Sequence, residues 1–137
     1  MIRLFEARDF QDVFFLNEIC YENPCTETEL REKLSSGKAW VEEPDPAVQA
    51  VIGAVIIVPH EGTNLIWSIT VAPTFRKRGI AWNLLSEAEN NFPELWLHTD
   101  PSGPAIGLYL RRGYKVVQEE PNFYGPSRPG VLMVKVK

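Results

Sequence analysis

The sequence predicts a mixed α/β fold, in which four helices cover the faces of a sheet of about seven strands. One observation is the spacing of apolar residues, which is helical in four segments and strand-like in seven. The other is the order of these segments: strand, two helices, three strands, helix, strand, helix and two strands. A length of 137 residues suits one sizeable core, so we expect a single domain over residues 1–137.

Capping residues and turn residues set the expected boundaries of these segments. Asp9 has the residue type of an N-cap for the first helix, and Thr26 and Glu29 have the spacing of a capping box for the second. Helices are predicted over residues 10–21, 26–35, 80–92 and 103–112. Strands are predicted over residues 2–6, 38–42, 49–58, 65–71, 95–99, 114–117 and 131–136.

The stretch 65–92 predicts a strand, a basic turn and a helix, which is the layout of an anion-binding site. Pro73 stops the strand, and the turn RKRGIA, residues 76–81, leads into the helix. Gly79 permits a close approach of the backbone to a ligand. The start of the helix presents unpaired N–H groups and the positive end of the helix dipole. The sequence therefore predicts that an anion such as a phosphate binds at this turn.

Composition excludes several other classes of protein. The net charge of −4 argues against a general nucleic-acid binder. No segment is apolar enough to span a membrane, and the N-terminus lacks the apolar region of a signal peptide, so we expect a cytoplasmic protein. Cys20 and Cys25 are too few and too plain in context for a disulfide framework or a metal site, and we expect both to be reduced.

A second pattern follows the basic turn at a characteristic distance. The chain contains Val71-Ala72-Pro73, then the turn 76–81, and then the pattern in residues 105–114, AIGLYLRRGY. In these three features the sequence resembles the GNAT N-acetyltransferase superfamily. The resemblance covers most of the chain from Val51 onward, and the two leading helices fit it as well.

This resemblance implies a GNAT-like acyl-CoA N-acyltransferase fold, whose splayed central strands hold the thioester of acetyl-CoA. Acetyl-CoA is then the co-substrate, and no metal is needed. The backbone of residues 76–81 would cradle the pyrophosphate, and that of residues 69–71 would pair with the pantetheine arm. Ser102 stands where many members have an asparagine that contacts this arm. The implied co-substrate-binding residues are Ile69, Thr70, Val71, Arg76, Lys77, Arg78, Gly79, Ile80, Ala81, Ser102 and Tyr109.

The resemblance also implies a general acid but supplies no obvious base. Tyr109 matches the tyrosine that protonates the departing CoA thiolate. Leu65 and Leu97 stand where relatives often have a glutamate base. His98 is the nearest titratable residue by sequence, although it alternates with Leu97 along the strand. Three routes are open for the amine proton. His98 removes it, a chain of water molecules removes it, or the amine arrives already neutral.

The expected function is acetyl-CoA-dependent transfer of an acetyl group to a primary amine, by direct attack in a ternary complex. Residues 19–34 and 122–124 are partly similar to the branch that acetylates protein N-termini, including those of ribosomal proteins. A small-molecule amine is an equal alternative as acceptor. There are two alternatives to an enzyme: a non-catalytic acyl-CoA-binding module, and a partner-binding domain without CoA affinity. Either a monomer or a homodimer is compatible with the sequence.

Overall fold

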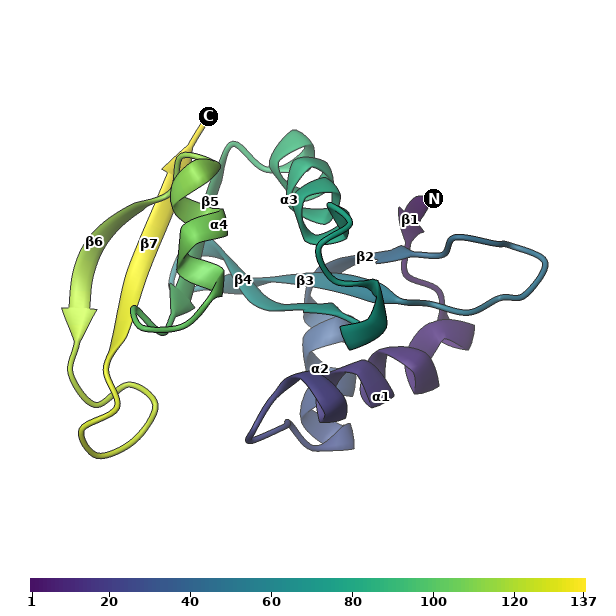
Figure 1. Ribbon diagram of the computed structural model, residues 1–137, viewed down its shortest axis with the longest axis horizontal. Helices are drawn as coiled ribbons and strands as arrows, with labels where there is room; N and C mark the ends of the chain where they lie inside the picture. Colours follow the sequence, from purple (N-terminus) through teal and green to yellow (C-terminus); the bar gives the residue numbers. More distant parts are fainter.

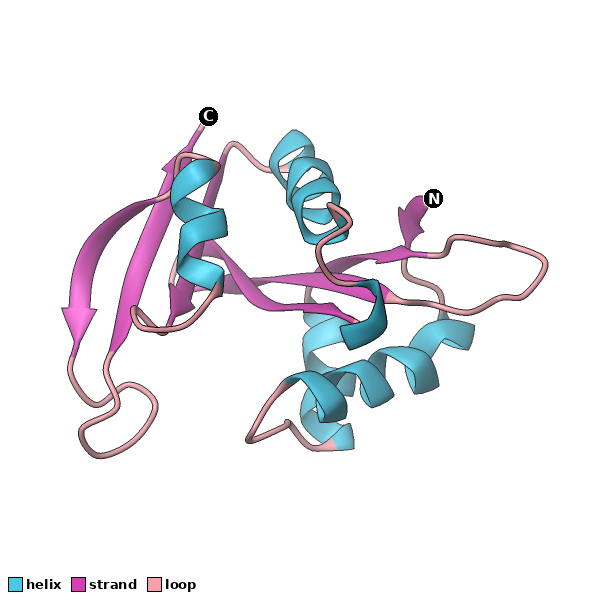
Figure 2. Cartoon of the chain, in the orientation of Figure 1, coloured by secondary structure: helices cyan, strands magenta, loops and turns pink.

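The computed structural model describes residues 1–137 and consists of one seven-stranded sheet with helices on both faces (Figures 1 and 2). None of the helices has the length and apolar character needed to cross a membrane. The helices are α1 (Phe10–Cys20), α2 (Glu27–Ser36), α3 (Ile80–Asn91) and α4 (Ala105–Arg111). The strands are β1 (Ile2–Leu4), β2 (Lys38–Glu42), β3 (Gly53–His60), β4 (Thr63–Val71), β5 (Glu94–Thr99), β6 (Lys115–Glu120) and β7 (Gly130–Val136). The predicted mixed α/β class and element order are confirmed.

The sheet separates two hydrophobic cores, because β3 is buried on both faces. Val55 and Ile57 belong to the core beneath α3 and α4, whereas Ala54, Ile56 and Val58 belong to the core beneath α1 and α2. Figure 1 shows the two helix pairs on opposite sides of the strands. Side chains alternate between the faces of a strand, so burial on both faces requires the continuous apolar run that the sequence shows.

The two central strands, β4 and β5, part from each other over most of their length. The sheet order is β1-β2-β3-β4-β5-β7-β6, and every neighbouring pair is antiparallel except β4 and β5, which are parallel. Leu65 and Trp96 are their only paired residues. The backbone groups of β4 beyond Leu65 therefore have no partner on β5, and the expected splaying of the central strands is confirmed.

An irregularity in β4 contributes to this divergence. Ile56 of β3 pairs with Ser68, and Ile57 pairs with Ile66, so Trp67 is an extra residue without a partner on β3. A bulge of this kind bends the strand that carries it and increases its local twist. The bulge lies two residues after Leu65, the residue of β4 that pairs with β5.

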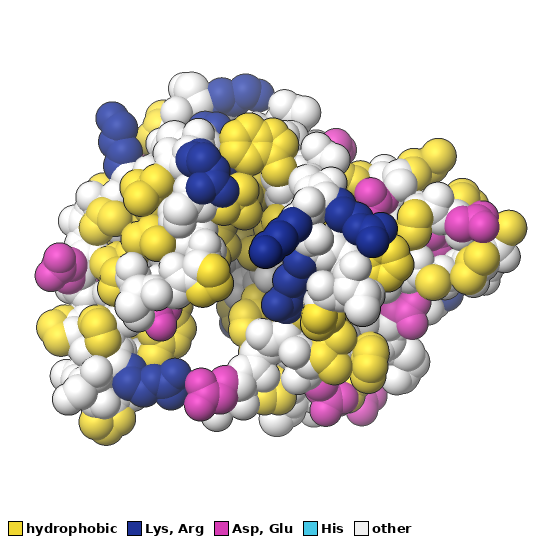
Figure 3. All heavy atoms as spheres, viewed as in Figure 1, with side chains coloured by type: hydrophobic (Ala, Val, Ile, Leu, Met, Phe, Trp, Pro, Cys, Tyr) yellow, Lys and Arg dark blue, Asp and Glu magenta, His cyan; other side chains and the backbone are white.

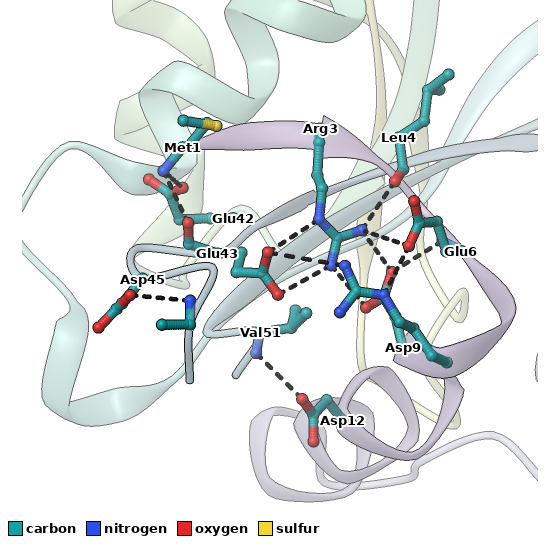
Figure 4. A network of polar contacts seen from close by, with 12 residues as sticks. Met1, Arg3, Leu4, Glu6, Asp9, Asp12, Glu42, Glu43, Asp45 and Val51 are labelled. Atoms are coloured by element: carbon teal, nitrogen blue, oxygen red, sulfur yellow. Dashed lines mark hydrogen bonds and ion pairs between the residues drawn. The ribbon is translucent and has the colours of Figure 1, made fainter. Parts of the chain in front are cut away.

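The predicted capping role of Asp9 is wrong. Its buried carboxylate accepts hydrogen bonds from Arg3 at 2.8 Å and from the Glu6 backbone N–H at 2.8 Å, and it makes no capping bond to α1. Arg3 also donates to Glu43 at 3.0 Å, so the cluster ties β1 to the end of β2 and the start of α1 (Figure 4). A buried carboxylate needs a charged or hydrogen-bonding partner, and Arg3 meets that need better than a free helix end.

Other boundaries show where tertiary pairing overrides the local pattern. The capping box of α2 is confirmed, because Glu29 N–H donates to Thr26 Oγ1 at 3.1 Å and Thr26 N–H to Glu29 Oε1 at 3.3 Å. The strand predicted from residue 49 begins only at Gly53. Gly53 pairs with Glu42, the last residue of β2. Ile52 still donates to the Glu42 carbonyl and accepts from Ala72 N–H, but the residues before Ile52 have no such bonds to β2 or β4.

Candidate active site

The divergence of β4 and β5 opens a cleft of about 1130 Å³. One wall consists of the end of α1, β4 and the turn before α3, and the other consists of the end of β5, α4 and the β6–β7 loop. Figure 3 shows this face hollowed, with Lys and Arg side chains gathered around the hollow. Small-molecule sites commonly measure about 300–1,000 Å³, so the cleft has room for an elongated ligand and a second small group.

The turn between β4 and α3 presents free backbone N–H groups. Lys77 and Gly79 have left-handed backbone conformations, with φ angles of 64° and 79°. Left-handed residues among right-handed ones turn successive N–H groups toward one concave side. None of the N–H groups of residues 77–81 donates a hydrogen bond within the protein. They lie at the N-terminus of the 12-residue helix α3, where the helix dipole is positive, so the turn is suited to a bound phosphate.

The side chains of this turn differ in their surroundings. Arg76 and Lys77 line the cleft, as does Gly79. Arg78 lies over an aromatic ring and is not part of the lining. Ile80 is buried in the core, and Ala81 packs against that core. Ile80 and Ala81 therefore offer a ligand their backbone only.

The edge of β4 that faces the cleft already has hydrogen-bond partners. Ile69 N–H donates to the Tyr21 hydroxyl at 3.2 Å, and that hydroxyl donates to the Ile69 carbonyl at 3.1 Å. The Val71 carbonyl accepts from Arg76 Nε at 3.2 Å. Backbone groups alternate in direction along a strand, so those of Thr70 face β3 instead. Of residues 69–71, Ile69 and Val71 are the ones whose backbone is directed into the cleft.

Tyr109 of α4 is buried against the core and also lines the cleft. Only 6% of its surface is exposed, and its ring packs edge-on against Tyr114 at a centroid distance of 5.8 Å. Its hydroxyl has no hydrogen-bond partner within the protein. Burial raises the pKa of Tyr109 above the ordinary value of a tyrosine, because the charged form is poorly solvated there. Tyr109 therefore keeps its proton at neutral pH and has it free to donate.

His98 lies on β5 with its side chain in the lining of the cleft. The preceding residue, Leu97, also borders the cleft, but its side chain is buried in the core with 1% exposure. The His98 ring stacks on Phe123 of the β6–β7 loop, with 4.1 Å between ring centroids. His98 Nε2 also lies 3.4 Å from the Glu120 carboxylate at the end of β6. These two contacts hold the imidazole against the wall of the cleft.

Ser102 is turned away from the cleft. Its backbone N–H and its hydroxyl both donate to Asp100 Oδ1 at 2.8 Å, and it is not part of the cleft lining. Asp100 does line the cleft, and these two hydrogen bonds lower the pKa of its carboxyl group. Asp100 is therefore a weak base, because its ionised form is the favoured one.

Several cleft residues were not among the predicted site residues. Tyr124 and Arg128 enter from the β6–β7 loop, and Tyr21 and Glu22 enter from the segment between α1 and α2. Glu22 Oε2 and Arg128 Nη2 lie 3.1 Å apart, so an ion pair links these two segments. The segment 122–124 carried a sequence signal. Nothing in the sequence pattern distinguished Tyr21, because its partners lie 47 and 48 residues away.

Comparison with protein families and solved structures agrees with this geometry. A family model described as "Acetyltransferase (GNAT) domain" matches residues 35–116, more than half of the chain. The ribosomal-protein-S18-alanine N-acetyltransferase of Escherichia coli has a TM-score of 0.86 and 16% identity, over 99% of this chain and 92% of that one. No curated protein sequence matches.

Two further solved structures of the same fold contain a bound molecule. NAA60 of Arabidopsis thaliana, in complex with a bisubstrate analogue, has a TM-score of 0.84 and 21% identity over 99% of this chain and 97% of that one. An aminoglycoside 6′-N-acetyltransferase complexed with coenzyme A has a TM-score of 0.82 and 18% identity over 99% and 96%. Identities this low show a shared fold. The family match goes further: the chain belongs to the GNAT acetyltransferases, and the class of enzyme is an N-acetyltransferase.

Proposed function

We propose that this chain transfers the acetyl group of acetyl-CoA to a primary amine by direct attack in a ternary complex. The observation that carries this proposal is the run of free N–H groups over residues 77–81, which borders the same cleft as Tyr109. A donor with an anionic end and a reactive thioester end fits a cleft that has an anion site and a proton donor. The coenzyme A and the bisubstrate analogue bound by two relatives of the same fold support this donor.

The residues that hold the donor lie along one wall of the cleft. The backbone amides of residues 77–81 bind the pyrophosphate, with the side chains of Arg76 and Lys77 adding positive charge. The backbone of Ile69 and Val71 faces the pantetheine arm. Ser102 reaches this arm only if its hydrogen bonds to Asp100 break, so we assign it a smaller role in binding the donor than Ile69 and Val71.

Two residues move the protons. His98 accepts a proton from the amine as the amine nitrogen bonds to the carbonyl carbon of the thioester. The carbon–sulfur bond then breaks, and Tyr109 donates its proton to the departing sulfur. The products are an N-acetylated amine and CoA with a free thiol. The contacts of His98 with Phe123 and Glu120 support this role, because they orient the imidazole in the cleft.

The acceptor is either a small-molecule amine or the N-terminus of a protein. The S18-alanine enzyme and the aminoglycoside enzyme share this fold and act on these two kinds of amine. Glu22 and Asp100 place carboxylates on the lining of the cleft, which attract an amine that approaches as a cation. Such an amine loses one proton to solvent before attack, so that the nitrogen has a lone pair, and His98 takes the second proton as the bond forms.

A thiol-release assay tests the proposed function. The purified protein is mixed with acetyl-CoA and a panel of polyamines, aminoglycosides and peptides with free N-termini, and free CoA thiol is measured. The same peptides with acetylated N-termini are the matched controls. We expect thiol release with at least one free amine and none with the blocked peptides. Binding of acetyl-CoA without thiol release from any amine would instead favour a non-catalytic binding module.

Replacing His98 tests the assigned base. We expect His98→Ala to lower kcat by about 10²-fold, which is the lower end of the contribution of a positioned base. His60→Ala is the matched control, because His60 is the other histidine of the chain and lies exposed at the end of β3. An unchanged kcat in His98→Ala would assign proton removal to water or to an amine that arrives neutral.

A further inference from the structure

Tyr21 reaches the cleft-facing edge of β4 from the segment that follows α1. Its hydroxyl accepts from Ile69 N–H at 3.2 Å, donates to the Ile69 carbonyl at 3.1 Å and lies 3.1 Å from Ser68 Oγ. A hydroxyl has one proton and two lone pairs, so all three contacts form together only if Ser68 is the donor in the last. Burial raises the pKa of Tyr21, which keeps the hydroxyl protonated. The hydrogen-bonding capacity of this hydroxyl is fully used.

The backbone of Ile69 is the part of β4 that a bound donor has to pass. β4 and β5 pair only at Leu65 and Trp96, so the N–H and C=O of Ile69 open into the cleft. The anion site over residues 77–81 and the Tyr109 side chain line the same cleft. An extended chain with amide groups that joins these two places runs beside β4 and pairs with its free edge, as an added strand does.

We propose that Tyr21 is a plug that imitates the donor: its hydroxyl occupies the Ile69 hydrogen-bonding groups that the pantetheine arm takes, and donor binding displaces it. The proposal rests on the proposed function, because it needs acetyl-CoA in this cleft. In the free protein the plug satisfies a strand edge that is otherwise unpaired. Each donor molecule then replaces existing hydrogen bonds, which lowers its apparent affinity.

Displacement of Tyr21 also acts on the acceptor side of the cleft. The next residue, Glu22, forms the ion pair with Arg128 of the β6–β7 loop. The side chains are 76% and 50% exposed, so this pair contributes little free energy and breaks easily. When the donor moves Tyr21, the attached Glu22 moves with it and the link between the two loops opens.

Tyr21→Phe tests the plug, because it removes the hydroxyl and keeps the ring. We expect calorimetry to give a Kd for acetyl-CoA that is about 2- to 10-fold lower than that of the unaltered protein, the net value of one hydrogen bond. Adenosine 3′,5′-bisphosphate is the matched control ligand, because it lacks the pantetheine arm and does not reach Ile69. Its affinity should be the same for both proteins. An equal or weaker affinity of Tyr21→Phe for acetyl-CoA would overturn the proposal.

Amide exchange gives a second readout that needs no ligand. The Ile69 amide of the free protein should exchange faster with solvent in Tyr21→Phe, since its acceptor is lost. An equal exchange rate would also overturn the plug. The failure of the proposed function looks different: neither protein binds acetyl-CoA, or both bind it and release no thiol with any amine. Equal affinity of the two proteins for acetyl-CoA, with thiol release retained, would refute the role of Tyr21 alone.

Discussion

Tyr109→Phe is expected to lower kcat by about 10²-fold or more, while acetyl-CoA still binds with nearly unchanged affinity. The substitution removes only the hydroxyl, which has no partner within the protein, and leaves the ring packed in the core. The loss therefore falls on protonation of the departing thiolate and spares the fold. Measurement of kcat by thiol release, together with calorimetric binding of acetyl-CoA, separates the two effects.

Tyr114→Phe is the matched control for this experiment. Tyr114 packs against Tyr109, but its hydroxyl donates to Glu89 at 3.2 Å and it does not line the cleft. Its removal should lower stability and leave kcat nearly unchanged. If Tyr109→Phe retained full kcat with a confirmed acceptor, Tyr109 would not be the general acid.

Glu89→Ala is expected to lower the free energy of unfolding by about 3 kcal/mol, because removing one member of a largely buried ionic cluster leaves its partners' charges uncompensated. The Glu89 carboxylate accepts from Arg112 at 2.6 Å, from Lys135 at 2.8 Å and from Tyr114 at 3.2 Å. It thereby ties α3 to the end of α4 and to β7. Glu87→Ala is the matched control, because Glu87 lies on the same helix and forms no ion pair. Urea denaturation measures both variants.

The same cluster makes stability depend on pH. Burial opposes ionisation of Glu89, but the hydrogen bonds from Arg112 and Lys135 outweigh it and lower its pKa. A carboxyl group whose pKa is lower in the folded state than in the unfolded state stabilises the protein when it is ionised. This stabilisation is fully present above the pKa of the unfolded state, which is about 4.3 for a glutamate. It is lost as the pH falls through the pKa of the folded state. The difference in stability between the unaltered protein and Glu89→Ala should be largest at neutral pH and shrink in acid. A difference that does not change with pH would contradict the assigned charge.

Local sequence signals predicted most of the fold. The capping box of Thr26 and Glu29 and the apolar run of β3 each depend on residues close together in the chain, and both predictions hold. The prediction for Asp9 failed because its partner Arg3 reaches it only through the packing of β1 beside the start of α1. The start of β3 was misplaced for a similar reason, since strand pairing ends where β2 ends.

The candidate site divides in the same way. The turn 76–81 is one contiguous segment, so its glycine, its charge and the helix that follows were visible in the sequence. The orientation of His98, which the sequence left open, required the side-chain contacts with Phe123 and Glu120. Ser102 was expected at the donor, but it lies against Asp100 because that carboxylate is two residues away and accepts both of its donors.

The sequence by itself determined the family, the order of the elements and the anion-binding turn, because these depend on spacing along the chain. Only the tertiary structure decided what occupies the free edge of β4. Tyr21 lies 48 residues from Ile69, and the bulge at Trp67 and the parting of β4 from β5 bring that edge within its reach. An unpaired strand edge attracts whichever polar group the fold places beside it, and no local pattern specifies which group that is.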